Sequence, residues 1–166
     1  MSADSHSLQV RINLRVARYA DRREDWTVFG FETQKDPQYA RAQRRYIGAS
    51  GSIDHNDRRG GLEPSAFTMS IQSMPAGHRI PVHRHETEET FFILGGSCLI
   101  RLFDGDEVAE VDLGKWDLIA CPPFMNHEII NTGAETCHVQ TLLSAAKPLR
   151  PQYQDAELLH LQSAAS

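Results

Sequence analysis

The run HRHETEETFF, which begins at His83, places two histidines and three glutamates within seven residues and then turns apolar. On a β-strand every second side chain points to the same side, so His83 and His85 are predicted to project together with Glu89. Glu86 and Glu88 fall out of phase and are predicted to face solvent, unless a turn or bulge breaks the parity. Two imidazoles and a carboxylate on one face suit a divalent transition metal.

A second stretch, GKWDLIACPPFMNHEIINTG, carries another histidine behind a Pro-Pro turn. His127 stands at the start of a predicted strand, and Asn131 follows four residues later. A third imidazole from a neighbouring strand is what a site with two histidines and one glutamate could use. The alternative is that His-x-His on a charged strand is a surface feature; the apolar FFIL that continues the strand favours burial.

These two stretches resemble the two sequence motifs of the cupin superfamily. The first motif is matched in every spacing by Gly77-x5-His83-x-His85-x3-Glu89-x6-Gly96. The second is matched by Gly114-x7-Pro122-x4-His127-x3-Asn131. Two positions depart from the family pattern, since Phe124 stands where glycine is common and Lys115 replaces the usual aspartate. Both concern the shape of a turn.

The resemblance implies a cupin double-stranded β-helix, a jelly-roll barrel, over residues 61–147. It implies four metal ligands in the mouth of that barrel: His83, His85, Glu89 and His127. Asn131 in this family supports the turn and is not a ligand. By motif position the resemblance also selects Glu89 from the three glutamates.

Such a ligand set has consequences for chemistry. Three neutral imidazoles and one carboxylate leave a divalent metal with a net charge near +1 and open positions, which is typical of a catalytic site. We expect one divalent transition metal, with Fe(II) the first expectation and Mn, Ni, Zn or Cu as alternatives. The expected substrate is a small anionic or chelating organic molecule.

Three functions remain open. The favoured one is a mononuclear-iron dioxygenase, an oxidoreductase, because dioxygenases are prominent among cupins. The first alternative is a non-redox isomerase or decarboxylase that uses Zn or Mn as a Lewis acid. The second is a cupin that binds a small molecule without catalysis.

The rest of the chain fits an all-β domain. From residue 66 onward, short alternating segments are separated by Gly, Pro and Asn/Asp turns such as Asp104-Gly105-Asp106. We expect Phe67, Met69 and Ile71 to fill the barrel interior, together with apolar residues in phase with the ligands. His138 and Gln140 are either pocket groups or an exposed polar face, and Arg101 is expected at the surface.

An N-terminal extension is predicted at residues 1–60, packed on the barrel or on a dimer partner. Its alternating apolar residues predict a strand at 8–18, and WTVFGFE predicts a second strand at 26–32. Residues 35–48 are ambiguous between helix and extended chain. Residues 48–61, rich in Gly, Ser, Asp and Asn, predict a loop that is a boundary or a lid. A tail at 148–166 holds a short helix at 155–161 and a polar end predicted to be disordered.

Composition bounds the partners. With 166 residues, 40% hydrophobic and 23% charged, the chain is expected to be one globular domain. The formal charge of -5 argues against nucleic acid as a partner. No apolar run approaches the ~20 residues of a membrane span, and the N-terminus lacks the apolar core of a signal peptide. The widely spaced Cys98, Cys121 and Cys137 predict reduced, buried thiols and a cytoplasmic protein. A homodimer is expected, because a strand at 8–18 needs a sheet edge to pair with.

Overall fold

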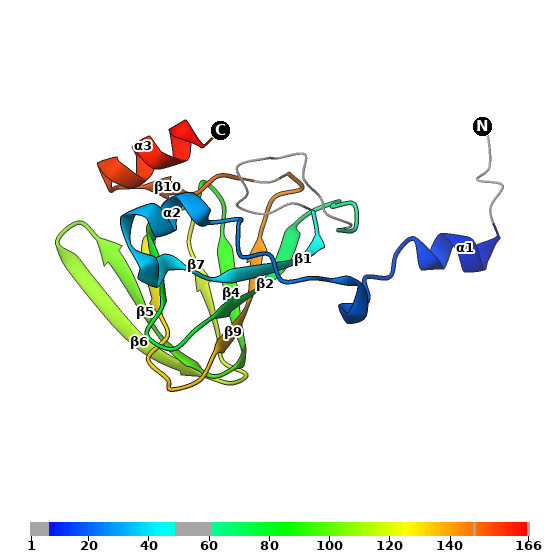
Figure 1. The fold of residues 1–166 in the computed structure, drawn as a ribbon, viewed down its shortest axis with the longest axis horizontal. Coiled ribbons are helices and arrows are strands. Elements are labelled where there is room, and N and C mark those ends of the chain that lie inside the picture. The colour runs from blue at the N-terminus through cyan, green and yellow to red at the C-terminus, as the bar shows by residue number, and fades with distance from the viewer. Residues whose placement is uncertain (1–6, 49–60, 148, 166) are drawn as a thin grey trace.

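The computed structural model describes residues 7–48, 61–147 and 149–165. Within these ranges, two five-stranded antiparallel sheets form a barrel (Figure 1). The first sheet has the order β1-β2-β9-β4-β7 and the second has the order β10-β3-β8-β5-β6. The predicted all-β, double-sheet barrel is confirmed.

The strands of the first sheet are β1 (Ala42–Ile47), β2 (Thr68–Met74), β9 (Cys137–Leu143), β4 (Glu89–Gly95) and β7 (Leu118–Cys121). Those of the second sheet are β10 (Gln152–Tyr153), β3 (Arg79–Arg84), β8 (Asn126–Ile130), β5 (Ser97–Asp104) and β6 (Glu107–Gly114). The helices are α1 (Leu8–Asn13), α2 (Gly30–Lys35) and α3 (Ala156–Ala164), with short 3-10 helices at Tyr19–Asp21 and Pro37–Tyr39.

The apolar core fills one end of the barrel. Ile93 on β4 lies directly across from Val139 on β9, and both are fully buried. Further along the same strands, toward the other end, the paired residues are Phe91 with Thr141 and then Glu89 with Leu143. Alternate residues share a face, so Ile93, Phe91 and Glu89 all point into the barrel. Along β4 the barrel interior therefore changes from apolar at Ile93 to polar at Glu89. The core therefore closes one end and leaves the other to the functional residues.

The run HRHETEETFF is two strands and not one. Strand β3 ends at Arg84, the chain turns at 85–88, and β4 begins at Glu89. The two strands belong to different sheets, so the turn carries the chain across the barrel mouth. The predicted parity along a continuous strand is therefore not the reason why Glu89 faces the histidines. Glu89 faces them because its sheet lies opposite theirs.

The strand predicted at 8–18 is wrong. The structure places α1 at Leu8–Asn13, capped by Ser7, whose side chain accepts a hydrogen bond from the Val10 backbone N–H. The segment extends away from the barrel and has no sheet edge beside it (Figure 1). Alternation stabilises a strand only where a partner strand satisfies its backbone, so here the local cap decides. None of the α1 residues is buried.

The strand predicted at 26–32 is also wrong. Asp25 forms an isolated β-bridge to Gln43, and the chain then enters α2. Phe31 on α2 packs against Tyr153 and Leu158, so this aromatic residue belongs to a helix that covers the barrel and not to a sheet. The ambiguous stretch at 35–48 resolves into a 3-10 helix and β1.

The C-terminal segment is ordered through α3. The helix predicted at 155–161 is confirmed and extends to Ala164, with Asp155 as its N-cap. Figure 1 shows α2, α3 and β10 together over one end of the barrel. The predicted loop 48–61 lies almost entirely outside the described residues. No helix in the described ranges has the length and apolar character needed to cross a bilayer.

Candidate metal centre

The four predicted ligands come from three strands and one turn. His83 on β3 and His127 on β8 are direct cross-strand partners in the second sheet. His85 follows β3 in the turn, and Glu89 opens β4 in the opposite sheet. All four side chains are buried. The structure thus brings together all the residues that the motifs select.

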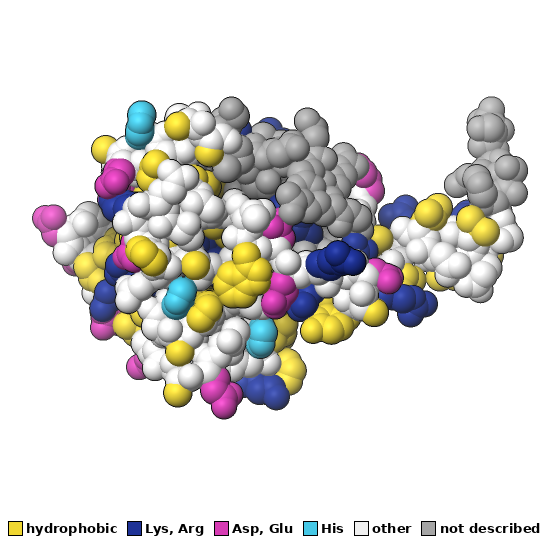
Figure 2. Space-filling view, viewed as in Figure 1, with side chains coloured by type: hydrophobic (Ala, Val, Ile, Leu, Met, Phe, Trp, Pro, Cys, Tyr) yellow, Lys and Arg dark blue, Asp and Glu magenta, His cyan; other side chains and the backbone are white. Residues whose placement is uncertain are grey.

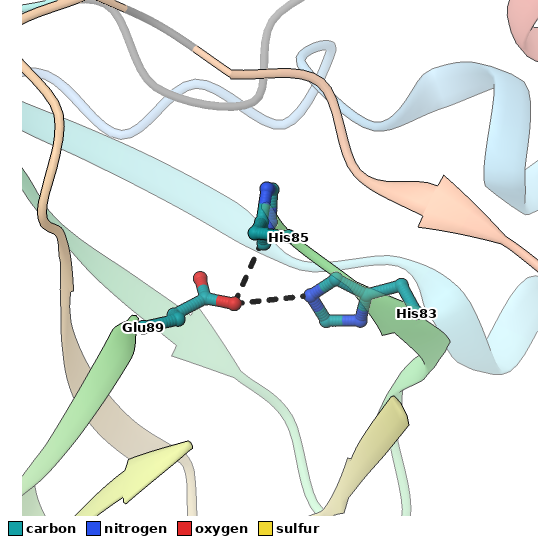
Figure 3. Close-up of side chains that lie close together, drawn as sticks. All are labelled: His83, His85 and Glu89. Carbon is teal, nitrogen blue, oxygen red and sulfur yellow. Dashed lines mark ion pairs between the residues drawn. The ribbon is translucent and has the colours of Figure 1, made fainter. Parts of the chain in front are cut away.

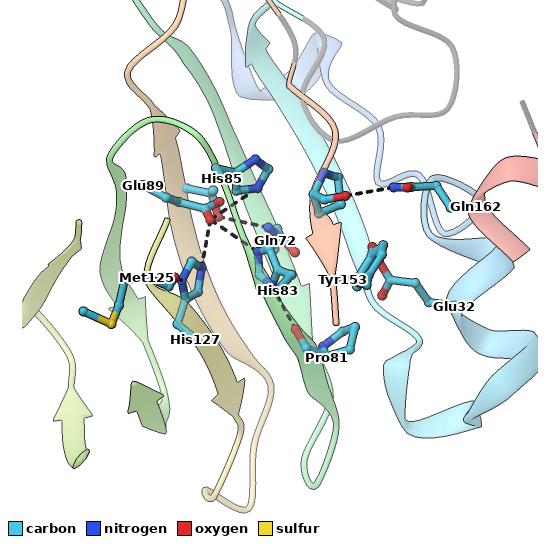
Figure 4. A network of polar contacts seen from close by, with 12 residues as sticks. Glu32, Gln72, Pro81, His83, His85, Glu89, Met125, His127, Tyr153 and Gln162 are labelled. Atoms are coloured by element: carbon cyan, nitrogen blue, oxygen red, sulfur yellow. Dashed lines mark hydrogen bonds and ion pairs between the residues drawn. The ribbon is translucent and has the colours of Figure 1, made fainter. Parts of the chain in front are cut away.

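The three imidazole rings converge on one carboxylate oxygen of Glu89. Glu89 Oε2 lies 3.0 Å from Nε2 of His127, 3.3 Å from Nε2 of His83 and 3.5 Å from Nε2 of His85. The donor atoms of His83, His85 and Glu89 all lie within 4.8 Å of one another. Figure 3 shows these three side chains pointing at a common centre, and Figure 4 adds His127 from β8.

Backbone carbonyls orient two of the imidazoles. His83 Nδ1 lies 2.8 Å from the Pro81 carbonyl oxygen, and His127 Nδ1 lies 2.9 Å from that of Met125. A carbonyl oxygen only accepts, so each Nδ1 carries the hydrogen. Each Nε2 is therefore the atom turned toward Glu89. A hydrogen bond from the ring nitrogen that faces away from the metal is the arrangement that fixes the tautomer of metal-binding histidines.

Burial and the carboxylate set the charges of the cluster. Burial lowers the pKa of His85 to about 4. Burial would also lower the pKa of His127, but hydrogen bonds with Cys121 and Glu89 outweigh it and raise that pKa to about 10. Burial would raise the pKa of Glu89, yet His85 and the hydrogen bonds from His127 and His83 hold it well below its usual range. The raised pKa of His127 and the lowered pKa of Glu89 both favour a proton on the imidazole and none on the carboxylate.

The donor set fits a divalent cation. Three imidazole nitrogens and a carboxylate oxygen point inward, and His127 Nε2 lies 3.0 Å from Glu89 Oε2. A divalent ion would take the place of a proton between these atoms and favour the neutral imidazoles, since metal ligands must be deprotonated. His85 Nδ1 is buried and has no hydrogen-bond partner among the described residues.

The turn before β8 has a left-handed backbone conformation of the kind that glycine usually adopts, although Phe124 occupies the position. Phe124 has a φ of 63°, in the left-handed region that glycine usually occupies. Its backbone N–H donates to the His85 carbonyl oxygen over 2.7 Å, so the turn holds the backbone of His85. Asn131 donates to the carbonyl oxygens of Met74 and Glu135, each over 2.8 Å, and thus secures the next turn.

A small cavity opens beside the cluster. Besides the candidate ligands, its lining includes the apolar residues Phe29, Ile80, Phe91, Leu143 and Pro151. Its polar lining consists of Glu32, Arg41, Gln43, Gln72, Thr141 and Tyr153. Figure 4 shows Tyr153 on β10 next to Glu32, on the side of His83 that faces away from Glu89.

The polar lining forms a connected network. Arg41 makes an ion pair with Glu32 at 2.5 Å, and Tyr153 donates its hydroxyl hydrogen to Glu32 over 2.5 Å. Arg41 Nε donates to Gln72 Oε1 over 2.8 Å, and Gln72 Nε2 donates to Thr141 Oγ1 over 3.0 Å. Burial and Glu32 raise the pKa of Tyr153 well above its usual range. The hydroxyl is therefore a neutral donor.

The prediction for the barrel wall on β2 has the wrong phase. Thr68, Ser70 and Gln72 are buried, whereas the expected core residues Met69 and Ile71 are only half-buried on the opposite face. The alternation was visible, but here the polar face turns inward, where Gln72 lines the cavity and Ser70 Oγ accepts a hydrogen bond from Gln43. Glu32 and Tyr153 were missed because they lie in segments whose position no local pattern specifies.

The remaining predicted positions lie away from the centre. Glu86 and Glu88 are exposed, as expected. Arg101 is partly exposed and pairs with Glu110 over 2.7 Å, as expected for a surface residue. His138 contacts Ser73 Oγ through Nδ1 at 3.1 Å and does not line the cavity.

Comparisons with known proteins agree with this geometry. A family model described as a cupin domain matches residues 70–144. No curated protein matches the sequence. Three solved structures illustrate the fold. A deletion mutant of Bacillus subtilis oxalate decarboxylase has a TM-score of 0.55 at 15% identity, covering 69% of this chain and 28% of that chain.

The other two are similarly distant. Oxalate decarboxylase of Lactobacillus farciminis, in a formate complex, has a TM-score of 0.51 at 15% identity, covering 64% of this chain and 28% of that chain. CapF with the inhibitor 3-isopropenyl-tropolone has a TM-score of 0.51 at 18% identity, covering 63% and 28%. The match thus spans little more than a quarter of each of these structures, and the likeness is one of fold.

Proposed function

Because residues 70–144 match a family model described as a cupin domain, we propose that this protein is a metal-dependent enzyme for a small anionic or chelating organic molecule. The ligands would be His83, His85, Glu89 and His127. The observation that carries the proposal is the convergence of three imidazole Nε2 atoms on one buried carboxylate oxygen, at 3.0 to 3.5 Å.

The chain's own residues prepare the site for such a molecule. Carbonyl oxygens hold two of the imidazoles, so little reorganisation is needed when a cation binds. Phe91, Ile80 and Leu143 line the cavity and exclude water from one side of the ligand. A bound divalent metal would supply Lewis-acid or one-electron chemistry there.

The finer proposal is a mononuclear-iron dioxygenase. It is supported by a ligand set that leaves open positions for both a substrate and O2. The test reconstitutes the purified protein with Fe(II) and follows oxygen uptake with a panel of phenols, diketones and thiols. Uptake with one substrate class, lost in the His83→Ala variant, is the expected result. No uptake with any member would contradict the dioxygenase proposal.

Metal analysis of protein purified without an affinity tag separates the alternatives. Iron would favour the dioxygenase, whereas Zn or Mn would favour an isomerase or decarboxylase. A protein that binds metal and a small molecule, but turns over no substrate, would be a binding protein. The last outcome contradicts the enzyme proposal while leaving the metal centre intact.

The protein is further proposed to be a homodimer. The support is now the projecting N-terminal segment, whose apolar side chains Leu8, Val10, Ile12, Leu14 and Val16 are 40–71% exposed. Figure 2 shows hydrophobic and basic side chains together on this segment, away from the barrel. Exposed apolar groups in such number are more stable when another surface covers them.

A further inference from the structure

The polar wall of the cavity is a chain of hydrogen bonds with a defined direction. A guanidinium has only donors, so the atom of Gln72 that faces Arg41 Nε must be the amide oxygen. The amide nitrogen of Gln72 then faces Thr141 Oγ1 and donates to it. Each link in the chain therefore runs from Arg41 through Gln72 to Thr141.

This chain ends in unused donors. Thr141 Oγ1 accepts from Gln72 and keeps its own hydroxyl hydrogen to donate. Gln72 Nε2 has a second N–H besides the one given to Thr141. No acceptor among residues 7–48, 61–147 and 149–165 receives either hydrogen, and both side chains line the cavity. A ligand group that meets this wall must accept hydrogen bonds.

The wall lies within reach of the candidate metal centre. Glu89 pairs across the strands with Leu143, and Thr141 is two residues further along β9 on the same face. Such diagonal neighbours in a sheet lie roughly 7–8 Å apart. One small molecule can therefore bind the cluster with one end and Thr141 with the other.

The charge of the wall is already balanced. Arg41 is paired with Glu32, and Tyr153 also donates to that carboxylate. A carboxylate brought to Gln72 and Thr141 would be buried without a free cation on this wall, which is costly. A carbonyl or carboxamide oxygen would meet the same donors without that penalty.

We infer that Gln72 and Thr141 are the specificity residues of the cavity and bind an uncharged acceptor oxygen of the substrate. This inference rests on the proposed function, since the cluster must hold the other end of the same molecule. The substrate class is thereby a small compound with a chelating head and an amide, ketone or ester carbonyl a few bonds away.

The test uses the Zn(II)-loaded protein and calorimetric binding of hydroxamates. Acetohydroxamate carries only the metal-chelating hydroxamate group, here called the head, and therefore measures binding at the cluster alone. Three further probes carry the same head on a two-carbon spacer and end in a carboxamide, an isopropyl group or a carboxylate. Wild-type protein is expected to bind the carboxamide about tenfold more tightly than the isopropyl probe, because two donors are satisfied. The carboxylate probe is expected to bind no more tightly than the carboxamide.

Three variants locate the effect. Thr141→Val should reduce the preference for the carboxamide to within about threefold, while acetohydroxamate binds as before. Thr141→Ser keeps the hydroxyl and should keep the preference. Thr68→Val makes the same chemical change at a buried threonine of β2 that does not line the cavity, and should also keep it.

The two levels of the hypothesis fail differently. If acetohydroxamate shows no metal-dependent binding, the proposed function is wrong and the inference falls with it. If the head binds but wild-type protein does not distinguish carboxamide from isopropyl, only the inference is overturned. An undiminished preference in Thr141→Val would likewise overturn it.

Discussion

His83 and His127 are oriented by the same local device, a hydrogen bond from Nδ1 to the carbonyl two residues earlier. Their cross-strand pairing then turns both Nε2 atoms toward Glu89 on the facing sheet. Residue types and motif spacing were enough to select all four residues. The reason for the convergence of Glu89 was not readable, because it depends on a turn between two sheets.

Because of His85, the metal-free protein is expected to lose stability at acid pH. Its pKa falls from 6.5 to about 4 on folding, so the unfolded chain binds a proton more readily between those values. The contribution of His85 to stability is therefore complete above pH 6.5 and is lost as the pH falls toward 4, by about 3 kcal/mol in total.

The comparison that isolates His85 is urea unfolding of wild type and His85→Gln at pH 7 and pH 4.5, with a chelator present. Wild type should lose more stability than the variant over this range. Equal losses in the two proteins would show that His85 is not held neutral by its burial.

At the scale of elements, the predictions succeeded for most strands of the barrel. The segments from β2 to β9 were found from alternation and turn residues, except that β3 and β4 were predicted as one continuous strand. They failed for residues 8–18 and 26–32, where alternation exists but no paired strand does. On β2 the phase was wrong because Gln72 and Ser70 make polar contacts inside the barrel, which strand periodicity cannot reveal.

Substitutions at two turn glycines distinguish the energetic cost of a left-handed backbone from the cost of close packing. Gly96 and Gly77 have similar positive φ values, 79° and 74°. A Cβ on Gly96 would lie 2.8 Å from the Cα of Cys137, whereas one on Gly77 would meet nothing within 4 Å. Gly77→Ala should therefore cost only the left-handed conformation, about 1 kcal/mol.

Gly96→Ala should cost that amount plus the displacement of β9, at least about 2 kcal/mol in total. Urea unfolding midpoints of the two variants and the wild type measure both quantities. If Gly96→Ala proved no more destabilising than Gly77→Ala, the close approach of the Gly96 turn to β9 would be incorrect.

At the scale of the whole molecule, the barrel was predictable but its cover was not. The all-β domain and the two cupin-like motifs follow from patterns within single segments. The cover consists of α2, β10 and α3, whose packing joins the N-terminal part of the chain to the C-terminal part. Glu32 and Tyr153 meet only through that packing, since they lie 121 positions apart in sequence.

The homodimer proposal has a direct test at this scale. Light scattering at micromolar concentration should give about 37 kDa, twice the 18.7 kDa of one chain. Leu14→Asp places a charge in the exposed apolar N-terminal segment and should shift the mass toward one chain. Val108→Asp, at an exposed valine of β6, is the matched control and should leave the dimer intact. A monomeric mass for the wild type would contradict the proposal.

The central claim is that four buried side chains hold one divalent metal ion. Calorimetric titration of the metal-free protein with Zn(II) should give one site per chain. Affinity should fall by at least about tenfold in His83→Ala, His85→Ala, Glu89→Gln and His127→Ala, because each removes a ligand. Glu86→Gln and Glu88→Gln, at exposed positions of the same turn, should bind like wild type. Equal affinity in Glu89→Gln and wild type, or no stoichiometric binding at all, would contradict the metal centre.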